Sequence, residues 1–195
     1  MSDTNNTCIL FNENKKRLLH FIYTDYIKNG LRTVDLRNVS IDSRNSETNN
    51  KHSSNNYVLY EIVEKAFSND TTLQRIILPK TIMTIEQSAF ENCSELQIVE
   101  KNTEDTESEL CIQYRAFKNC QKLHSFVICQ TKNVVIESEA FSGCFNLRTV
   151  RITGEANISD SAFEGCDKDK LCFVCKKNSS VAKYAREHGY RYVNV

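Results

Sequence analysis

Apolar residues return along the chain in a unit of 22 to 27 residues, and the dipeptide Ala-Phe marks each copy. The alanine of this dipeptide stands at positions 66, 89, 116, 140 and 162. The full unit is apolar-x-Ile-x-x-x-Ala-Phe-x-x-Cys-x-x-Leu-x-x-apolar-x-apolar, with Asp70 in place of the cysteine in the first copy. Self-similarity at a fixed period of this size is the sequence signature of a repeat architecture. The pattern therefore predicts a solenoid, mainly β, in which each coil stacks on the next.

Each column of the unit predicts a local structure. Alternation such as Val134-x-Ile136 and Val150-x-Ile152 is typical of short strands with one inward face. The inward column two residues before the isoleucine holds Tyr60, Met83, Leu110, Val134 and Ala156. The stretch around Ala-Phe is too short for a full helix, so we expect a single helical turn there. Its alanine lets coils approach closely, and its phenylalanine stacks on that of the next coil. We expect a right-handed coil, capped by short helices at both ends.

Four of the nine cysteines occupy one column of the repeat and therefore one interior line of the stack. They are Cys93, Cys120, Cys144 and Cys166. Free cysteine is among the most buried residue types, which favours a packing role. The alternative is a metal or redox ladder, but a spacing of more than 20 residues places one thiol on each coil, a poor tetrahedral site.

The repeat resembles the BspA-like leucine-rich-repeat family, whose units run Leu-x-x-Ile-x-Leu-Pro and then Ile-x-x-x-Ala-Phe-x-x-Cys. The segments Leu73-Gln-Arg-Ile76-Ile-Leu78-Pro79 and Ile85-Glu-Gln-Ser-Ala89-Phe90-Glu-Asn-Cys93 match this signature. The tail from Ser179 to Val195 is similar to the closing segment of the family. The resemblance implies a leucine-rich-repeat fold and a surface or interaction protein, in several cases an adhesin, and does not imply catalysis. Most copies lack the proline, and the last has Asp169 where leucine belongs.

The regions outside the clean repeats complete the domain organisation. Leu18, Leu19, Ile22 and Tyr26 share one helical face, and Gly30 suits the end of such a helix. Residues 42–56 contain no apolar side chain, which is typical of a disordered segment. A second, acidic insertion from Asn102 to Glu109 accounts for the spacing of 27. We expect a disordered N-terminus over 1–14, a cap helix and degenerate first repeat over 15–40, a disordered polar insertion over 41–56, leucine-rich repeats over 57–170, and a cap of strand, helix and strand over 171–195.

Charge and hydropathy narrow the class of partner. The chain of 195 residues carries 25 basic and 25 acidic residues, so no overall field favours nucleic acid or an anionic membrane. No apolar run approaches the roughly 18 residues needed to span a bilayer. Met1 to Asn14 lacks the basic-then-apolar order of a secretory signal, which makes the cytoplasm the default expectation. The alternative is the cell surface, reached by unconventional export.

Residues suited to catalysis or metal binding are few. Cys172-x-x-Cys175 is a single pair in a strand-like run, so a zinc or redox role is kept only as an alternative. The four histidines, His20, His52, His124 and His188, lie in unrelated contexts, and no glycine-rich phosphate loop occurs. We therefore expect that the chain is not an enzyme and that it binds no cofactor.

The remaining candidate is the exposed sheet face, a usual docking surface of solenoids. The outward positions of its strands are Thr33, Asp35, Arg37, Arg75, Ile77, Ile98, Glu100, Ser125, Val127, Thr149 and Arg151. Their centre, Ile77, Ile98 and Val127, is apolar and has arginines beside it, which is typical of a protein interface. The alternative is simple β-propensity. We expect a protein partner, such as a host or matrix protein if the chain is a surface adhesin or antigen. The alternative is that the chain is an intracellular scaffold or regulatory subunit.

Overall fold

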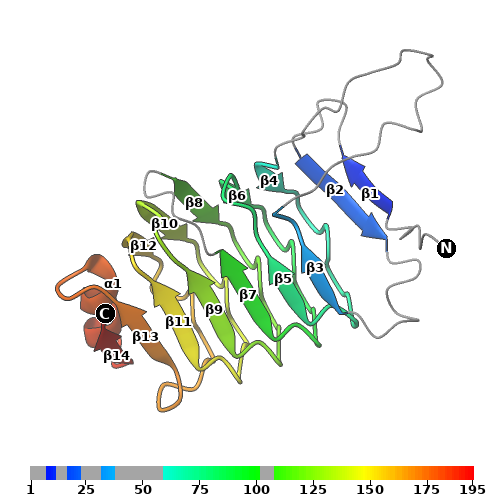
Figure 1. The fold of residues 1–195 in the computed structure, drawn as a ribbon. Coiled ribbons are helices and arrows are strands. Elements are labelled where there is room, and N and C mark those ends of the chain that lie inside the picture. The colour runs from blue at the N-terminus through cyan, green and yellow to red at the C-terminus, as the bar shows by residue number, and fades with distance from the viewer. Residues whose placement is uncertain (1–7, 12–16, 23–31, 38–58, 102–107) are drawn as a thin grey trace, which may run out of the picture.

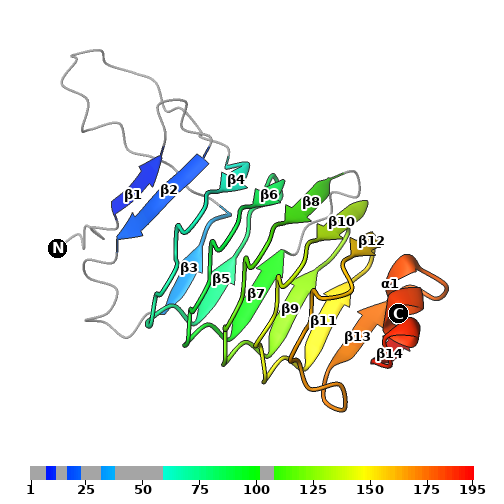
Figure 2. The ribbon, with the colours of Figure 1, turned by 180° about the vertical axis from the view of Figure 1, so that it is seen from behind.

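The computed structural model describes residues 8–11, 17–22, 32–37, 59–101 and 108–195 (Figure 1). The chain is a β-solenoid with two seven-stranded sheets, and its coils follow one another from the N-terminal to the C-terminal end (Figures 1 and 2). Sheet A contains β1 (Cys8–Phe11), β2 (Arg17–Ile22), β4 (Glu61–Ile62), β6 (Thr84–Ile85), β8 (Glu109–Ile112), β10 (Asn133–Ile136) and β12 (Glu155–Ile158). Sheet B contains β3 (Thr33–Asp35), β5 (Arg75–Ile77), β7 (Ile98–Lys101), β9 (Ser125–Ile128), β11 (Thr149–Ile152), β13 (Cys172–Cys175) and β14 (Arg191–Asn194). The predicted solenoid of short strands is confirmed.

A column of stacked phenylalanine rings fills the interior between the sheets. The five rings of the Ala-Phe dipeptides lie with successive centroids 4.8, 4.9, 5.2 and 4.9 Å apart. Their planes are within 10° of parallel. This separation matches the spacing of roughly 4.8 Å between hydrogen-bonded strands. Each coil therefore advances by one strand width, and the expected stacking of Phe on Phe is present.

The Ala-Phe segment differs from the helical turn expected from the sequence. Ala66 N donates to Val63 O of its own coil, whereas Phe67 N donates to Ala89 O of the next coil, 2.8 Å away. Lys65 and Asn69 adopt positive φ, of 59° and 64°. The backbone N–H groups of alternate residues donate to the neighbouring coil, so a continuous helical hydrogen-bond pattern does not form. The turn thereby joins each coil to the next.

One positive-φ column explains a further regularity of the repeat. It holds Asn69, Asn92, Asn119, Gly143 and Gly165. Asparagine and glycine are the residue types that best tolerate this conformation. The asparagines also form a ladder, in which Asn92 Nδ2 donates to Asn69 Oδ1 (2.9 Å) and Asn119 Nδ2 donates to Asn92 Oδ1 (3.0 Å). A Cβ at Gly143 would lie 2.4 Å from Asn119 Oδ1, so the column changes to glycine where the ladder ends.

The cysteine column has a specific hydrogen-bonding role. Cys93 Sγ donates to Phe67 O of the preceding coil (3.0 Å), and Cys120 Sγ donates to Phe90 O (3.1 Å). Cys144 and Cys166 repeat the contact. Burial raises the pKa of the Cys120 thiol well above its usual range, which keeps it protonated and able to donate. The column thus packs the interior and satisfies a buried carbonyl.

The cap helix expected from Leu18, Leu19, Ile22 and Tyr26 is wrong at residues 17–22, the part of it that the structure describes. Arg17–Ile22 form β2, which pairs antiparallel with β1 and parallel with β4. A short apolar run fits either a helix face or a strand, and here pairing with sheet A decides between them. Cys8–Phe11, expected to be disordered, form β1. Residues 23–31, the insertion expected over 41–56, and residues 102–107 of the insertion expected over 102–109 lie outside the described residues.

Two core positions also differ from expectation. Met83 is 51% exposed, because Ile82 beside it enters the interior and is fully buried. In the last repeat Asp169 is exposed, while Leu171 is fully buried two residues later. The inward position therefore shifts where the turns change length.

Helix α1 (Ser180–Glu187) covers the C-terminal end of the interior. Ser179 caps its N-terminus by accepting from Ala182 N at 3.3 Å. Glu155 of β12 accepts from both the backbone N (2.8 Å) and Oγ (2.6 Å) of Ser180, which lowers the pKa of its carboxyl. These bonds dock the helix on the edge of sheet A. Within the part of the chain that the structure describes, no helix has the length and apolarity to span a bilayer.

Candidate interaction surface

The outward side chains of β3, β5, β7, β9 and β11 form two rows across sheet B, here called the B face. The first row is Thr33, Arg75, Ile98, Ser125 and Thr149, and the second is Asp35, Ile77, Glu100, Val127 and Arg151. Parallel pairing in one register aligns the members of each row, while the intervening residues point inward and are buried. The sequence positions predicted for the surface therefore lie together, apart from Arg37, which follows the end of β3.

The same rows continue beyond the predicted residues. Cys172 and Arg191 extend the first row, and Val174 and Val193 extend the second. Sequence reasoning missed them because the last repeat loses its leucine at Asp169. The alternation of Cys172 and Val174 with buried Phe173 was the available signal.

The apolar centre of the B face is smaller than expected. Ile77 points outward but is only 9% exposed. Ile98 and Val127 are half-buried and offer the accessible apolar surface of the central strands. The centre therefore consists of Ile98 and Val127.

Two ion pairs organise the N-terminal half of the face. Arg37 Nη2 lies 2.6 Å from Asp35 Oδ2, and this guanidinium lowers the pKa of the Asp35 carboxyl. Arg75 Nη2 reaches Glu100 Oε1 on the next strand at 2.7 Å. Both pairs are partly exposed, so each contributes little to stability. Their effect is to fix the direction of two arginines across the face.

The arginines at β11 are Arg148, just before the strand, and Arg151 within it. Arg151 Nε is buried and has no hydrogen-bond partner among the described residues, and the same holds for Arg75 Nε on β5. Neither Arg148 nor Arg151 forms an ion pair with a described carboxylate. A buried nitrogen donor without a partner is uncommon, because leaving it unpaired costs about 1–3 kcal/mol. The face therefore holds an unused donor on β5 as well as on β11, but Arg75 is also paired through Nη2, whereas Arg148 and Arg151 form no such pair among the described residues.

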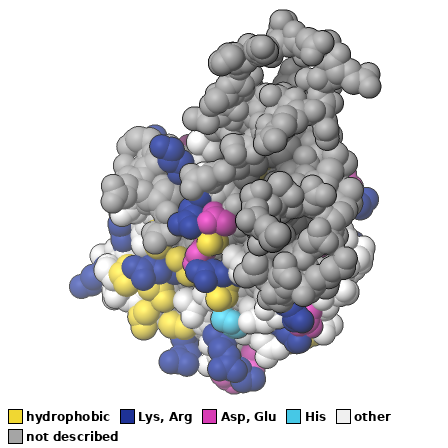
Figure 3. Space-filling view, turned by 45° about the vertical axis from the view of Figure 1, so that its right-hand side comes forward, with side chains coloured by type: hydrophobic (Ala, Val, Ile, Leu, Met, Phe, Trp, Pro, Cys, Tyr) yellow, Lys and Arg dark blue, Asp and Glu magenta, His cyan; other side chains and the backbone are white. Residues whose placement is uncertain are grey.

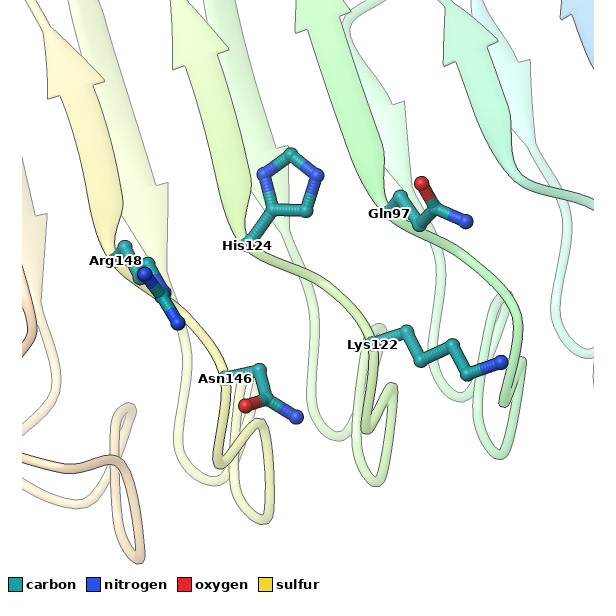
Figure 4. A pocket seen from close by; sticks show the side chains of 5 residues that line it. All are labelled: Gln97, Lys122, His124, Asn146 and Arg148. Atoms are coloured by element: carbon teal, nitrogen blue, oxygen red, sulfur yellow. The ribbon is translucent and has the colours of Figure 1, made fainter.

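A hollow of about 420 Å³ lies where β7, β9 and β11 begin. It is lined by Gln97, Lys122, His124, Asn146 and Arg148, which come from three successive coils (Figure 4). Gln97, His124 and Arg148 each directly precede a strand, and the register of those strands aligns them. On one side of the molecule, hydrophobic side chains gather beside several Lys and Arg side chains (Figure 3). Sequence reasoning did not single out the hollow, although a polar column after each leucine was a visible signal.

The alternative of a joint zinc or redox site at Cys172 and Cys175 does not fit the geometry. The two residues lie three apart in β13, so their side chains point to opposite faces of sheet B. Cys172 is half-buried on the outer face, whereas Cys175 is buried in the core, where burial raises its pKa. Among the described residues, no group of three or more His, Cys, Asp and Glu could hold a metal ion.

The repeat, the parallel pairing of its strands in two sheets and the outward rows define a leucine-rich-repeat solenoid. The sequence matches the BspA type leucine rich repeat region in six copies over residues 35–183. The chain therefore belongs to the BspA-type leucine-rich-repeat family, as the signature around Ala89-Phe90 predicted.

Solved structures share this fold. The crystal structure of the pneumococcal vaccine antigen PcpA matches with a TM-score of 0.52 and 11% identity, covering 96% of this chain and 46% of PcpA. A leucine-rich repeat protein from Bacteroides ovatus matches with a TM-score of 0.54 and 20% identity, covering 88% of this chain and 48% of that protein. The chain thus spans about half the length of each. No curated protein matches it significantly in sequence.

Proposed function

We propose that the chain is a non-enzymatic protein-binding module that uses the B face. The observation that carries this proposal is the surface itself: Ile98 and Val127 are accessible apolar side chains on neighbouring strands, and Val127 is in register with Arg151, whose Nε lacks a partner among the described residues. Apolar side chains with arginine nearby are characteristic of interface centres. Leucine-rich solenoids present such extended faces to macromolecular partners.

The non-enzymatic part of the proposal is supported by where the ionisable groups lie. His188 stacks on Tyr184 and contacts Asp160 at the end of α1, whereas His124 lies at the start of β9. The thiols of the repeat column are buried, and burial raises the pKa of Cys120 and Cys166. A buried, protonated thiol is a poor nucleophile.

A matched pair of substitutions tests the use of the B face. Val127 and Val135 are both half-buried outward valines of central strands, Val127 on sheet B and Val135 on sheet A. A partner recovered from cells with the unchanged chain should bind Val127→Asp at least about ten-fold more weakly, because a buried unpaired charge is costly. Val135→Asp should bind as the unchanged chain does. Equal binding by Val127→Asp, with an unchanged circular-dichroism melt, would contradict the proposal.

A second form of the proposal places the same module at the cell surface, as an adhesin or antigen. Its support is the likeness to PcpA, described as a pneumococcal vaccine antigen. Antibody against the chain should then stain unpermeabilised native cells. Staining that appears only after permeabilisation would instead favour an intracellular scaffold or regulatory subunit.

A further inference from the structure

The hollow at the start of β7, β9 and β11 is built from nitrogen donors. Each of its five lining residues ends in at least one N–H group, and two of them, Lys122 and Arg148, are cations. Lys122 is already paired, since its Nζ lies 2.7 Å from Glu95 Oε1 on the preceding coil. Asn146 Nδ2 donates to Gln121 O at 2.7 Å. The donor capacity that remains therefore centres on Arg148 and its neighbours on β9 and β7.

Arg151, which does not line the hollow, adds a second donor without an acceptor among the described residues, as Arg75 does on β5. Arg151 Nε is buried without a hydrogen-bond partner there, three residues along the chain from Arg148. Val127 stands beside Arg151 in one row of the B face, and Ile98, which directly follows Gln97 of the hollow, lies on the next strand in the other row. The local surface is thus cationic at its edge and aliphatic next to it.

We propose that this corner receives a carboxylate side chain from a partner protein, carried on a segment with aliphatic residues beside it. The carboxylate enters the hollow and accepts from Arg148, while the aliphatic neighbours cover Ile98 and Val127. This inference rests on the proposed function and specifies its partner. Arginine pairs with carboxylate through two parallel hydrogen bonds, which gives orientation as well as attraction.

A protein carboxylate fits better than a polyanion such as sulfated polysaccharide or nucleic acid. Binding of a polyanion requires several unpaired cations in a row on the protein surface. Here the cations are few, one is already paired, and aliphatic residues adjoin them. The chain as a whole is also neutral.

The test is selection of random peptides, displayed on phage, against the whole protein. We expect enrichment of peptides with one Asp or Glu beside Val, Ile or Leu. A synthetic copy of an enriched peptide should bind Arg148→Gln about ten-fold more weakly, and binding should weaken near 1 M salt, where charges are screened beyond about 3 Å. Arg186→Gln is the matched control, because Arg186 is an exposed arginine on α1.

A double-mutant cycle locates the contact. Changing the acidic residue of the peptide to its amide should weaken binding as Arg148→Gln does, and the two changes together should cost less than their sum. Additive effects would overturn the proposed contact.

The other outcomes separate this inference from the proposed function. Enriched peptides without an acid, whose binding is lost in Val127→Asp, would overturn the carboxylate site and leave the module intact. Binding of heparin or single-stranded DNA as tight as that of the peptides, and lost in Arg148→Gln, would overturn it in favour of a polyanion. Failure to find any peptide sensitive to Val127→Asp would count against the proposed function as well.

Discussion

The outer faces of the two sheets share a backbone design and differ in their side chains. Strands β4, β6, β8, β10 and β12 contain no lysine or arginine, and their outward residues include three glutamates. The outward residues of sheet A are Glu61, Thr84, Glu109, Cys111, Asn133, Val135, Glu155 and Asn157. Sheet B carries Arg75, Arg151 and Arg191 outward, with the acids Asp35 and Glu100 and with Ile98, Val127, Val174 and Val193. The outward rows of sheet A are therefore polar with acidic charges, whereas those of sheet B combine arginines, two acids and aliphatic side chains.

This difference is informative because both sheets have the same role in the fold, so the fold alone does not require different outward side chains. Along sheet A the polar side chains serve the neighbouring coil: Glu86 Oε2 accepts from Glu64 N (2.9 Å), and Glu137 Oε2 accepts from Tyr114 N (2.8 Å). On sheet B, Arg151 Nε remains buried and unpaired among the described residues. These two glutamates beside sheet A are used by the fold, whereas Arg151 on the B face is not paired with any described residue. We therefore look for function on the B face.

The largest expected effect comes from breaking the interior that both faces share. Phe117 stacks on Phe90 and Phe141 and meets Phe126 of β9 edge-on, at 5.7 Å between centroids. Phe117→Ala should lower the free energy of unfolding by about 3–5 kcal/mol, because it leaves a cavity between the sheets. Urea denaturation measures this loss.

Phe145→Ala is the matched control for that substitution. Phe145 is 54% exposed, so its removal should change stability by no more than about 0.5 kcal/mol. Similar losses in the two variants would mean that the Phe column does not hold the two faces together.

Most of this interior could be predicted, because five aligned copies of the repeat report the same environment. The Phe column and the register of the B face follow directly from the spacing around Ala89-Phe90 and its counterparts. The pairing of strands that are distant in the sequence could not be predicted in the same way. Whether Leu18 and Ile22 belong to a helix or a strand depends on pairing with β4, about 40 residues away in the sequence.

The candidate site was only partly visible for a related reason. Its rows lie within strands, where alternation fixes direction, so Ile98 and Val127 could be placed outward from the sequence. The low exposure of Ile77 and the hollow at Arg148 depend on side chains from several coils and their turns. No local pattern encodes those neighbours.

Thiol labelling gives a smaller but direct comparison of the faces. Cys172 lies half-buried on the outer face of sheet B, and Cys111 lies half-buried on that of sheet A. Burial and the nearby Glu137 carboxylate raise the pKa of Cys111, which lowers its thiolate fraction. With iodoacetamide in slight alkali, we expect Cys172 to react several-fold faster than Cys111, as followed by peptide mass spectrometry.

The buried column supplies the internal control for labelling. Cys120 and Cys144 should react only when urea unfolds the chain, because both are fully buried. Faster reaction of Cys111 than of Cys172 would contradict the assigned environments of the two faces.

The smallest expected effect concerns the corner where sheet A passes into the Ala-Phe turn. Glu139 Oε2 lies 2.7 Å from Lys118 Nζ and 3.0 Å from Arg115 Nε. These hydrogen bonds, with Lys118 the stronger influence, lower the pKa of the Glu139 carboxyl from 4.5 to about 2. The folded chain therefore favours the ionised form, and the resulting stability is present above pH 4.5 and lost as the pH falls towards 2.

Glu139→Gln should remove this contribution and flatten the dependence of stability on pH below 4.5. The variant should be slightly less stable than the unchanged chain near pH 7, and the gap should close near pH 2. Urea midpoints measured across that range test it, with Glu164→Gln, an exposed glutamate one coil further on, as the control. Because the cluster is partly exposed to solvent, added salt should shrink the difference. A profile for Glu139→Gln parallel to that of the unchanged chain would show that this corner is held by its backbone hydrogen bonds, such as Phe117 N to Ala140 O at 2.8 Å, and not by its charges.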